Sequence, residues 1–351
     1  FNANRKATLV LSGSPISNTY TVVVDGNTIT HASGSSGTYD SILSALKSSI
    51  DALSISGLTT TKYRESLHLS DSNSTITIST FGGDGGDAIY VFQDQVDSVT
   101  QLPDQSFNNH LVKVVNTNST NDTYFAQFVA DNGVSGPGHW GEGKDPSKST
   151  GLNPATMPHE LVNTSLNAFT FRQVSWTARL VGDDTTNSHP SFVGNKIESS
   201  FYFNSRLGFL SNDNVSMSQS QDFFNFYHTS AQTITAADPI DLKASTIKPA
   251  TLYSVLPTTQ GLLLFSKDQQ FMMSAADGVL TPTSTNIRVI SSYDMETDIT
   301  PVDMGGIINF VSKTPSYTRT FGMRTFGQDE NPKILDIGRV VNEWVPATVD
   351  T

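Results

Sequence analysis

Only one stretch of this 351-residue chain carries the period of an α-helix. In residues 38–53, TYDSILSALKSSIDAL, apolar side chains recur at intervals of three and four residues, which is typical of a helix with one buried face. Thr38 or Asp40 can cap its first turn. Elsewhere short strand-like runs alternate with polar turns, and the abundant Ser, Thr, Asn and Gly suit such turns. The sequence therefore predicts a mostly β protein.

Residues 1–88 are expected to form a small α+β domain on the N-terminal side. Asp25-Gly26-Asn27 lies between β-branched runs, which is a strong signal for a hairpin. The run STITISTF, beyond the helix, alternates as a strand does. A sheet with one helix laid across it is the simplest domain that these elements form.

The glycine-rich stretch FGGDGGDAIY, residues 81–90, matches one unit of the calcium-binding β-roll repeat. In a β-roll each ion lies between two successive repeats, so one copy supplies half of the ligands. The next glycine pair, Gly305-Gly306, has no Asp at the matching place. Asp84 and Asp87 are the metal candidates of this stretch, and a plain glycine turn is the favoured interpretation. No metal site and no cofactor are predicted.

Residues 89–185 are predicted to form a second, β-rich domain. Short β segments are interrupted by a Gly/Pro/Ser-rich stretch, residues 131–158, that has no periodicity and is expected to be a long loop at the surface or a junction. Strand character resumes in NAFTFRQVSWTARLVGDD. The side chains expected to point inward there are Phe169, Phe171, Val174, Trp176 and Leu180.

Residues 186–351 contain a weak internal echo. Three segments each have an apolar run, a polar turn that begins with Ser, and a second strand. The marker residues Ser211, Ser266 and Ser312 lie 55 and 46 residues apart in turn. Blades of β-propellers repeat at about 40–50 residues. A propeller-like body of short hairpins and a generic β-sandwich both fit this pattern.

The charge balance excludes one class of partner. The chain has 21 Lys and Arg against 33 Asp and Glu, for a net charge of −12, and no basic cluster. Such a surface repels phosphates on average, so sequence-specific DNA binding is not expected. The chain has no cysteine, which excludes disulfides and thiolate chemistry. No apolar run has the length of a membrane span. Because it begins at Phe1, the chain is expected to be part of a longer protein.

No residue pattern indicates catalysis. His139 and His159 each have a Glu nearby, but the two-histidine spacing of a zinc protease helix is absent. Adjacent acids at Asp183-Asp184 and Asp329-Glu330 could serve glycoside hydrolysis, yet such pairs are more often solvated turns. The chain is predicted not to be an enzyme.

An aromatic run, DFFNFYH, could stack on bases or sugars. It lacks basic neighbours, so packing is the favoured interpretation. Its four aromatic residues are candidates for the subunit interface or the core: Phe223, Phe224, Phe226 and Tyr227.

Several phrases resemble the tail nozzle family, also called tail tubular protein B, of short-tailed bacteriophages. The resemblance covers residues 89–345 and runs in the same order as in the family; residues 1–88 match only by pattern. The phrases are YFAQFVADN, TMPHELV, PSFVGNKI, NSRLGFLSNDNVSMSQ, DFFNFY, ADPIDL and GLLLFSKDQQFMMS followed by LTPTS.

This resemblance implies a structural protein of the virion tail. Family members form a homohexameric tube below the tail adaptor ring, help to dock the tail fibres, and conduct the double-stranded DNA genome during ejection. The resemblance also implies a propeller-like body, and a longer full protein. No catalytic residues carry over.

Two other functions remain open at this stage. A polysaccharide-binding or wall-degrading tail module would use a carboxylate pair or an aromatic cleft, with two acids of raised pKa meeting in a groove. A calcium-stabilised adhesin would be built around Asp84 and Asp87.

Overall fold

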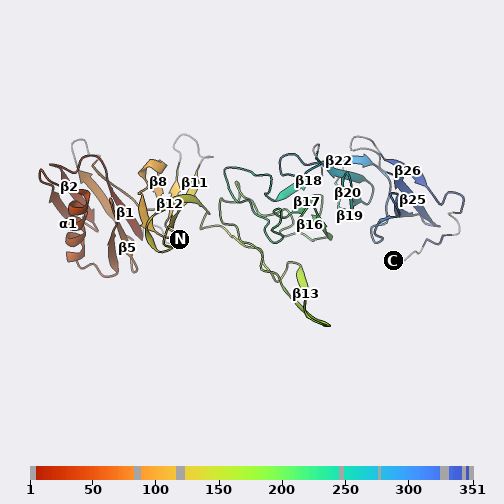
Figure 1. Cartoon of the computed structure of the whole chain (residues 1–351), viewed down its shortest axis with the longest axis horizontal. Coiled ribbons are helices and arrows are strands. Elements are labelled where there is room, and N and C mark those ends of the chain that lie inside the picture. The colour runs from red at the N-terminus through yellow and green to blue at the C-terminus, as the bar shows by residue number, and fades with distance from the viewer. Residues whose placement is uncertain are drawn as a thin grey trace. The chain divides into compact units, whose positions relative to one another are not determined.

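The computed structural model describes residues 5–82, 88–115, 123–244, 249–275, 278–324, 332–341 and 345–347 (Figure 1). The chain divides into two compact units. The first comprises Phe1–Ser149 with Leu180–Asp183, and the second comprises Thr150–Arg179 with Asp184–Thr351. The domain boundaries predicted after residues 88 and 185 stay predictions. The protein is mostly β, as predicted, and the described part contains one α-helix.

The first part of unit 1 contains the predicted helix and hairpin. Asp25 and Gly26 adopt φ values of 47° and 81° and join two antiparallel strands, which confirms the hairpin. Two sheets result, of order β4-β5-β1-β7 and β3-β2-β6. The elements are β1 (Lys6–Leu11), β2 (Thr19–Val24), β3 (Asn27–Ala32), α1 (Tyr39–Ala52), β4 (Leu58–Lys62), β5 (Ser66–Asp71), β6 (Ile78–Gly82) and β7 (Ile89–Phe92).

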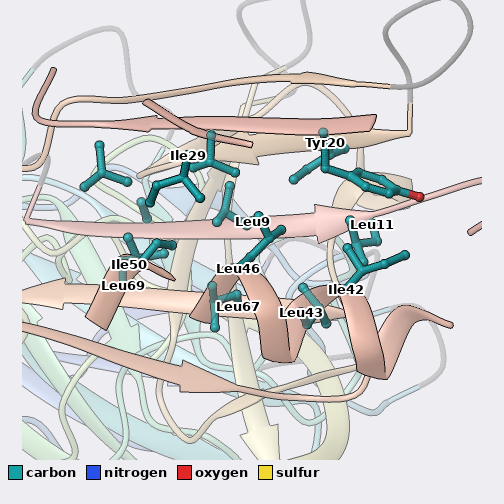
Figure 2. Close-up of a cluster of buried hydrophobic side chains, with 14 of the residues drawn as sticks. Leu9, Leu11, Tyr20, Ile29, Ile42, Leu43, Leu46, Ile50, Leu67 and Leu69 are labelled. Atoms are coloured by element: carbon teal, nitrogen blue, oxygen red, sulfur yellow. The ribbon is translucent and has the colours of Figure 1, made fainter. Parts of the chain in front are cut away.

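Helix α1 begins at a capping box. The Thr38 hydroxyl accepts a hydrogen bond from the Ser41 amide, and the Ser41 hydroxyl accepts one from the Thr38 amide. One face of α1 is buried against the strands, as its apolar period predicts. Figure 2 shows Leu43 and Leu46 among side chains of β1 and β5. This packing forms the first hydrophobic core of the chain.

The second part of unit 1 is a five-stranded sheet of order β8-β10-β11-β12-β9. Its strands are β8 (Gln95–Val96), β9 (Gln105–Phe107), β10 (Leu111–Val114), β11 (Tyr124–Ala130) and β12 (Ser135–Gly143), with a short 3₁₀ helix at Val99–Gln101. The expectation of an irregular loop over residues 131–158 is wrong for β12. A Cβ at Gly138 would meet the Val129 carbonyl oxygen and lie 2.7 Å from Phe128 Cζ. Close packing requires glycine there, and glycine hid the strand from the sequence pattern.

Unit 2 contains a two-stranded sheet and three four-stranded antiparallel sheets. The two-stranded sheet pairs β13 (His159–Ser165) with β14 (Ala168–Gln173). The other strands follow in chain order: β15 (Ser199–Phe203), β16 (Arg206–Ser211), β17 (Asn214–Met217), β18 (Ile240–Lys243), β19 (Leu252–Thr258), β20 (Gly261–Ser266), β21 (Gln270–Ser274), β22 (Asn286–Ser291), β23 (Val302–Asp303), β24 (Ile308–Lys313), β25 (Thr318–Arg324) and β26 (Lys333–Asp336).

The internal echo corresponds to these three sheets. Ser211, Ser266 and Ser312 lie at or near the ends of β16, β20 and β24, each a central strand of its sheet. Strand β20 is buried on both faces: Leu262 and Leu264 pack in a core with the preceding sheet, while Leu263 and Phe265 pack in a core with the following one. Face-to-face packing of four-stranded meanders is the arrangement of propeller blades. A closed propeller is not present in the described residues.

Candidate functional site

The most distinctive surface of unit 2 is the β-ribbon formed by β13 and β14, visible in Figure 1 as a narrow hairpin. Leu161 pairs with Phe171, and Asn163 pairs with Phe169. Side chains at every second position of a strand share a face, so Leu161, Phe169 and Phe171 lie on one face of the ribbon.

The exposure of this face is high. Leu161 is 66 %, Phe169 61 % and Phe171 70 % exposed, and Leu166 in the turn is 91 % exposed. The neighbouring pair Glu160–Arg172 points to the opposite face and forms an ion pair of 2.7 Å between Oε1 and Nε. The ribbon is therefore amphipathic, with an apolar face that no described residue of this chain covers.

His159 completes the apolar face. Its ring stacks on Phe171 with centroids 5.1 Å apart, and its Nδ1 lies 3.0 Å from the Met157 carbonyl oxygen. The imidazole acts here as a packing group at the start of the ribbon.

The prediction that Phe169, Phe171 and Leu180 point inward is wrong, because all three are more than 60 % exposed. Val174 is buried and Trp176 is half-buried, as expected. The alternation of apolar and polar residues shows which side chains share a face of a strand. It does not show whether another part of the fold covers that face. Sequence reasoning missed Leu161 and Leu166; the available signal was the hairpin pattern HELV-NTSLN-AFTF, whose two strands have no third strand nearby in sequence.

The aromatic run divides between core and surface. Phe226 and Tyr227 are buried, and Phe226 packs on Phe209 with centroids 5.3 Å apart. Phe224 is half-buried against Trp176. Only Phe223 is exposed, at 38 %, and its ring makes an edge contact of 5.6 Å with Tyr202, which is 60 % exposed. We call Tyr202 and Phe223 the aromatic pair.

A buried arginine holds the loop that follows the aromatic run. Arg206 is 2 % exposed, and its guanidinium donates to the carbonyl oxygens of Ser218 and Asp238 at 2.7 Å, and to those of Ala236 and Ala237. Burial lowers the pKa of Arg206, and the nearby Asp238 carboxylate opposes that shift. The fork of the guanidinium thus ties β16 to the loop that precedes β18.

Asp238 stabilises the same loop, the one that precedes β18, through hydrogen bonds to residues of the loop itself. Burial raises its pKa, but hydrogen bonds from the amides and hydroxyls of Thr229 and Thr235 outweigh burial, so the pKa of Asp238 lies below its usual value. The ionised carboxylate is stabilised by these donors, which is an architectural role.

Two buried histidines meet in unit 1. His68 on β5 and His110 before β10 have ring centroids 5.3 Å apart. Thr8 Oγ1 lies 3.0 Å from His68 Nδ1, and Ser106 Oγ lies 2.8 Å from His110 Nδ1. Burial lowers the pKa of His68 to about 4 and holds the pKa of His110 well below its usual range. Both rings are neutral at neutral pH and pack as core aromatic groups.

The predicted metal candidates Asp84 and Asp87 lie outside the described residues. Within the described ranges, no group of three or more His, Asp or Glu side chains is placed to hold a metal ion.

The acidic pairs considered for glycoside hydrolysis are not seen meeting in a groove. Asp184 forms an ion pair of 2.9 Å with the buried Arg179, and Asp329 and Glu330 lie outside the described residues. The pKa values of Asp51, Asp71 and Asp238 all lie below the usual value for an aspartate. In the described part of the chain, no helix is long and apolar enough to cross a membrane.

Comparison with known proteins gives a family and one curated relative. The family model described as bacteriophage nozzle protein matches residues 1–351. The tail tubular protein gp12 of Escherichia phage T7 is 32 % identical over 253 residues, which are 71 % of this chain and 31 % of that protein. The chain therefore spans less than half of the length of the curated relative it matches.

Proposed function

Since this chain belongs to the bacteriophage nozzle protein family, we propose that six copies of the full protein form the tube through which the double-stranded DNA genome leaves the phage tail. The protein is a structural component of the phage tail and resides in the virion. The tail adaptor ring and the tail fibres are its proposed partners. No catalytic step and no cofactor belong to this function.

The family match over all 351 residues is the observation that carries the proposal. Ring assembly is supported further by the surface of unit 2. Its ribbon is a sheet of only two strands with an exposed apolar face, and such a hairpin is marginal in water without a surface to pack on. A closed ring of identical subunits covers such surfaces with head-to-tail contacts.

A propeller body is the second part of the proposal. The sheet β23-β24-β25-β26 packs one face on the preceding sheet, and its other face carries apolar side chains. Val302, Ile307, Leu335 and Ile337 are 44–59 % exposed there, around Gly322, where an added Cβ would lie 3.2 Å from Ile307 and closer to Ile337. A further blade from the rest of the full protein would cover this face.

The charge of the chain fits transport of DNA rather than storage. With a net charge of −12, the subunit offers few sites that could bind phosphate groups and release counterions. A DNA duplex that passes through a negatively charged tube finds few sites that bind its phosphates. We therefore expect passage that does not depend on the DNA sequence.

Electron microscopy of the purified full-length protein tests this function. We expect sixfold symmetric rings with an axial channel wide enough for a DNA duplex, and rings that bind the adaptor complex. Channel-free particles, or rings of a symmetry that cannot close around DNA, would contradict the proposal.

A further inference from the structure

We propose that the apolar face of the β13–β14 ribbon in one copy packs on the aromatic pair, Tyr202 and Phe223, of the neighbouring copy. The inference deepens the proposed function and depends on it, because it names the contact that joins adjacent subunits of the ring. Both surfaces belong to unit 2, and they lie 30 or more residues apart in the sequence.

The ribbon needs a partner for its own stability. A two-stranded hairpin is marginal in water, and independent stability requires a third strand or a surface to pack on. In this chain β13 and β14 form a sheet of their own. The pairing of Leu161 with Phe171 stabilises the hairpin across its strands, but both side chains keep about two-thirds of their surface in water. A covering surface completes this fold.

The size of the apolar face favours a ring neighbour over an independent partner. A buried phenyl side chain covers 150–250 Å², so Phe169 and Phe171 together expose roughly 250 Å². A stable pairwise complex needs about 800 Å² on each partner. The ribbon supplies about a third of that, which suffices only as one contact among several. A copy in a ring has two neighbours, and closure holds each contact in place.

Charge does not oppose a second copy as the occupant of this face. The whole chain carries −12, so two copies repel each other over most of their surfaces. The ribbon, residues 159–173, contains one Glu and one Arg, which pair with each other on the polar face. Its apolar face is formally neutral and can approach an acidic subunit without charge repulsion or the burial of an unpaired charge.

The aromatic pair is the matching receptor. A head-to-tail contact requires two different patches on each chain, and the ribbon is the first. The exposed face of the last sheet is assigned above to a further blade. Outside the ribbon, Tyr202 and Phe223 are two exposed aromatic rings of unit 2 that contact each other, with the edge of one ring toward the face of the other. A further aromatic ring from another copy can pack on such a pair in the same edge-to-face geometry.

Cysteine cross-linking between copies tests the contact directly. These 351 residues contain no cysteine, and any cysteine elsewhere in the full-length protein is first changed to serine. Phe169→Cys and Tyr202→Cys are made as two separate proteins, which are co-assembled and oxidised. We expect a covalent dimer in the mixture and none with either protein alone.

Three other outcomes separate the possible failures. Rings that form without the mixed cross-link overturn this inference and leave the proposed tube intact. A cross-link with Phe169→Cys alone overturns it in favour of ribbon-to-ribbon pairing. Full-length protein that stays a monomer overturns both this inference and the proposed ring.

A second set of variants measures the energetic role of the ribbon. Phe169→Ser combined with Phe171→Ser should shift the ring-to-monomer midpoint at least tenfold toward higher protein concentration. Phe81→Ser in unit 1 is the matched control, because Phe81 is 62 % exposed on β6, and it should leave the midpoint unchanged. If the double variant instead keeps the ring and loses only binding to vesicles of phosphatidylethanolamine and phosphatidylglycerol, the ribbon contacts lipid and the inference fails.

Discussion

Leu161 and Phe171 face each other across the β13–β14 ribbon, and each leaves about two-thirds of its side chain in water. The same cross-strand pairing inside a three-stranded sheet would be ordinary core packing. Here it stands on a two-stranded ribbon, so the apolar face of the single chain stays in water.

Glycine in β12 is required for strand packing, and a matched pair of substitutions tests this. Gly138→Ala places a Cβ against the Val129 carbonyl oxygen and Phe128, so it should destabilise unit 1 by about 2 kcal/mol. Gly141→Ala in the same strand meets its nearest atom, Gln127 O, at 4.0 Å and should change the free energy of unfolding little. Urea unfolding of both variants measures the difference. Equal losses would show that β12 does not pack as described.

The buried guanidinium of Arg206 should be irreplaceable. Arg206→Met leaves the carbonyl oxygens of Ser218 and Asp238 without their donor, and this should lower the free energy of unfolding by about 3 kcal/mol. Arg206→Lys should recover little, because one ammonium cannot reproduce the planar fork. Arg319, which is not buried among carbonyl oxygens, offers Arg319→Lys as a control. Full rescue by Lys at position 206 would show that charge alone is needed.

Unit 1 should lose stability in mild acid. The pKa of His68 is lowered from 6.5 to about 4 in the folded protein, so the unfolded chain binds the extra proton first as the pH falls below 6.5. The contribution of His68 to the stability of the fold is therefore fully present well above pH 6.5 and is lost as the pH falls toward 4. The full loss from this residue is about 3 kcal/mol.

A variant isolates the histidine contribution. Between pH 6.5 and 5, where few carboxylates titrate, His68→Gln should flatten the slope of unfolding free energy against pH. His139→Gln, at an exposed position, should leave the slope as in the wild type. An unchanged slope in His68→Gln would contradict the burial of a neutral ring.

The N-terminal cap of helix α1 should make a measurable contribution to the stability of unit 1. Thr38→Ala removes the hydroxyl that accepts from the Ser41 amide and should destabilise unit 1 by about 1 kcal/mol. Ser36→Ala, two residues earlier and exposed, should be neutral. Thermal unfolding followed by circular dichroism compares the two, and equal melting temperatures would speak against the capping box.

Local patterns predicted the parts of this fold that are governed by local chemistry. The apolar period of residues 38–53 gave helix α1, and Asp25-Gly26 gave the first hairpin because both residues tolerate positive φ. The Ser-marked echo corresponds to three four-stranded sheets for a similar reason, since each repeat is one hairpin with its flanking strands.

What the sequence did not reveal depends on contacts distant along the chain. The sequence pattern did not predict strand β12 because the strand is rich in glycine. Glycine is needed there because β11 packs too closely for a side chain at Gly138, and a local pattern does not record that contact. Phe169 and Phe171 alternate like core residues, but no sheet in the described part of the chain covers them. Phe226 and Phe223 belong to one aromatic run, yet one is core and the other surface. Whether a side chain is buried depends on its place in the folded chain. The candidate site consists of side chains that look like core residues in the sequence but are exposed in the fold.

The mass of the full-length protein in solution, measured by light scattering at low and moderate salt, tests the central claim most directly. The ring proposal predicts a particle of six copies that persists in moderate salt, because the subunit contacts are apolar and salt screens the repulsion between acidic chains. A particle of one copy at both salt concentrations would contradict it.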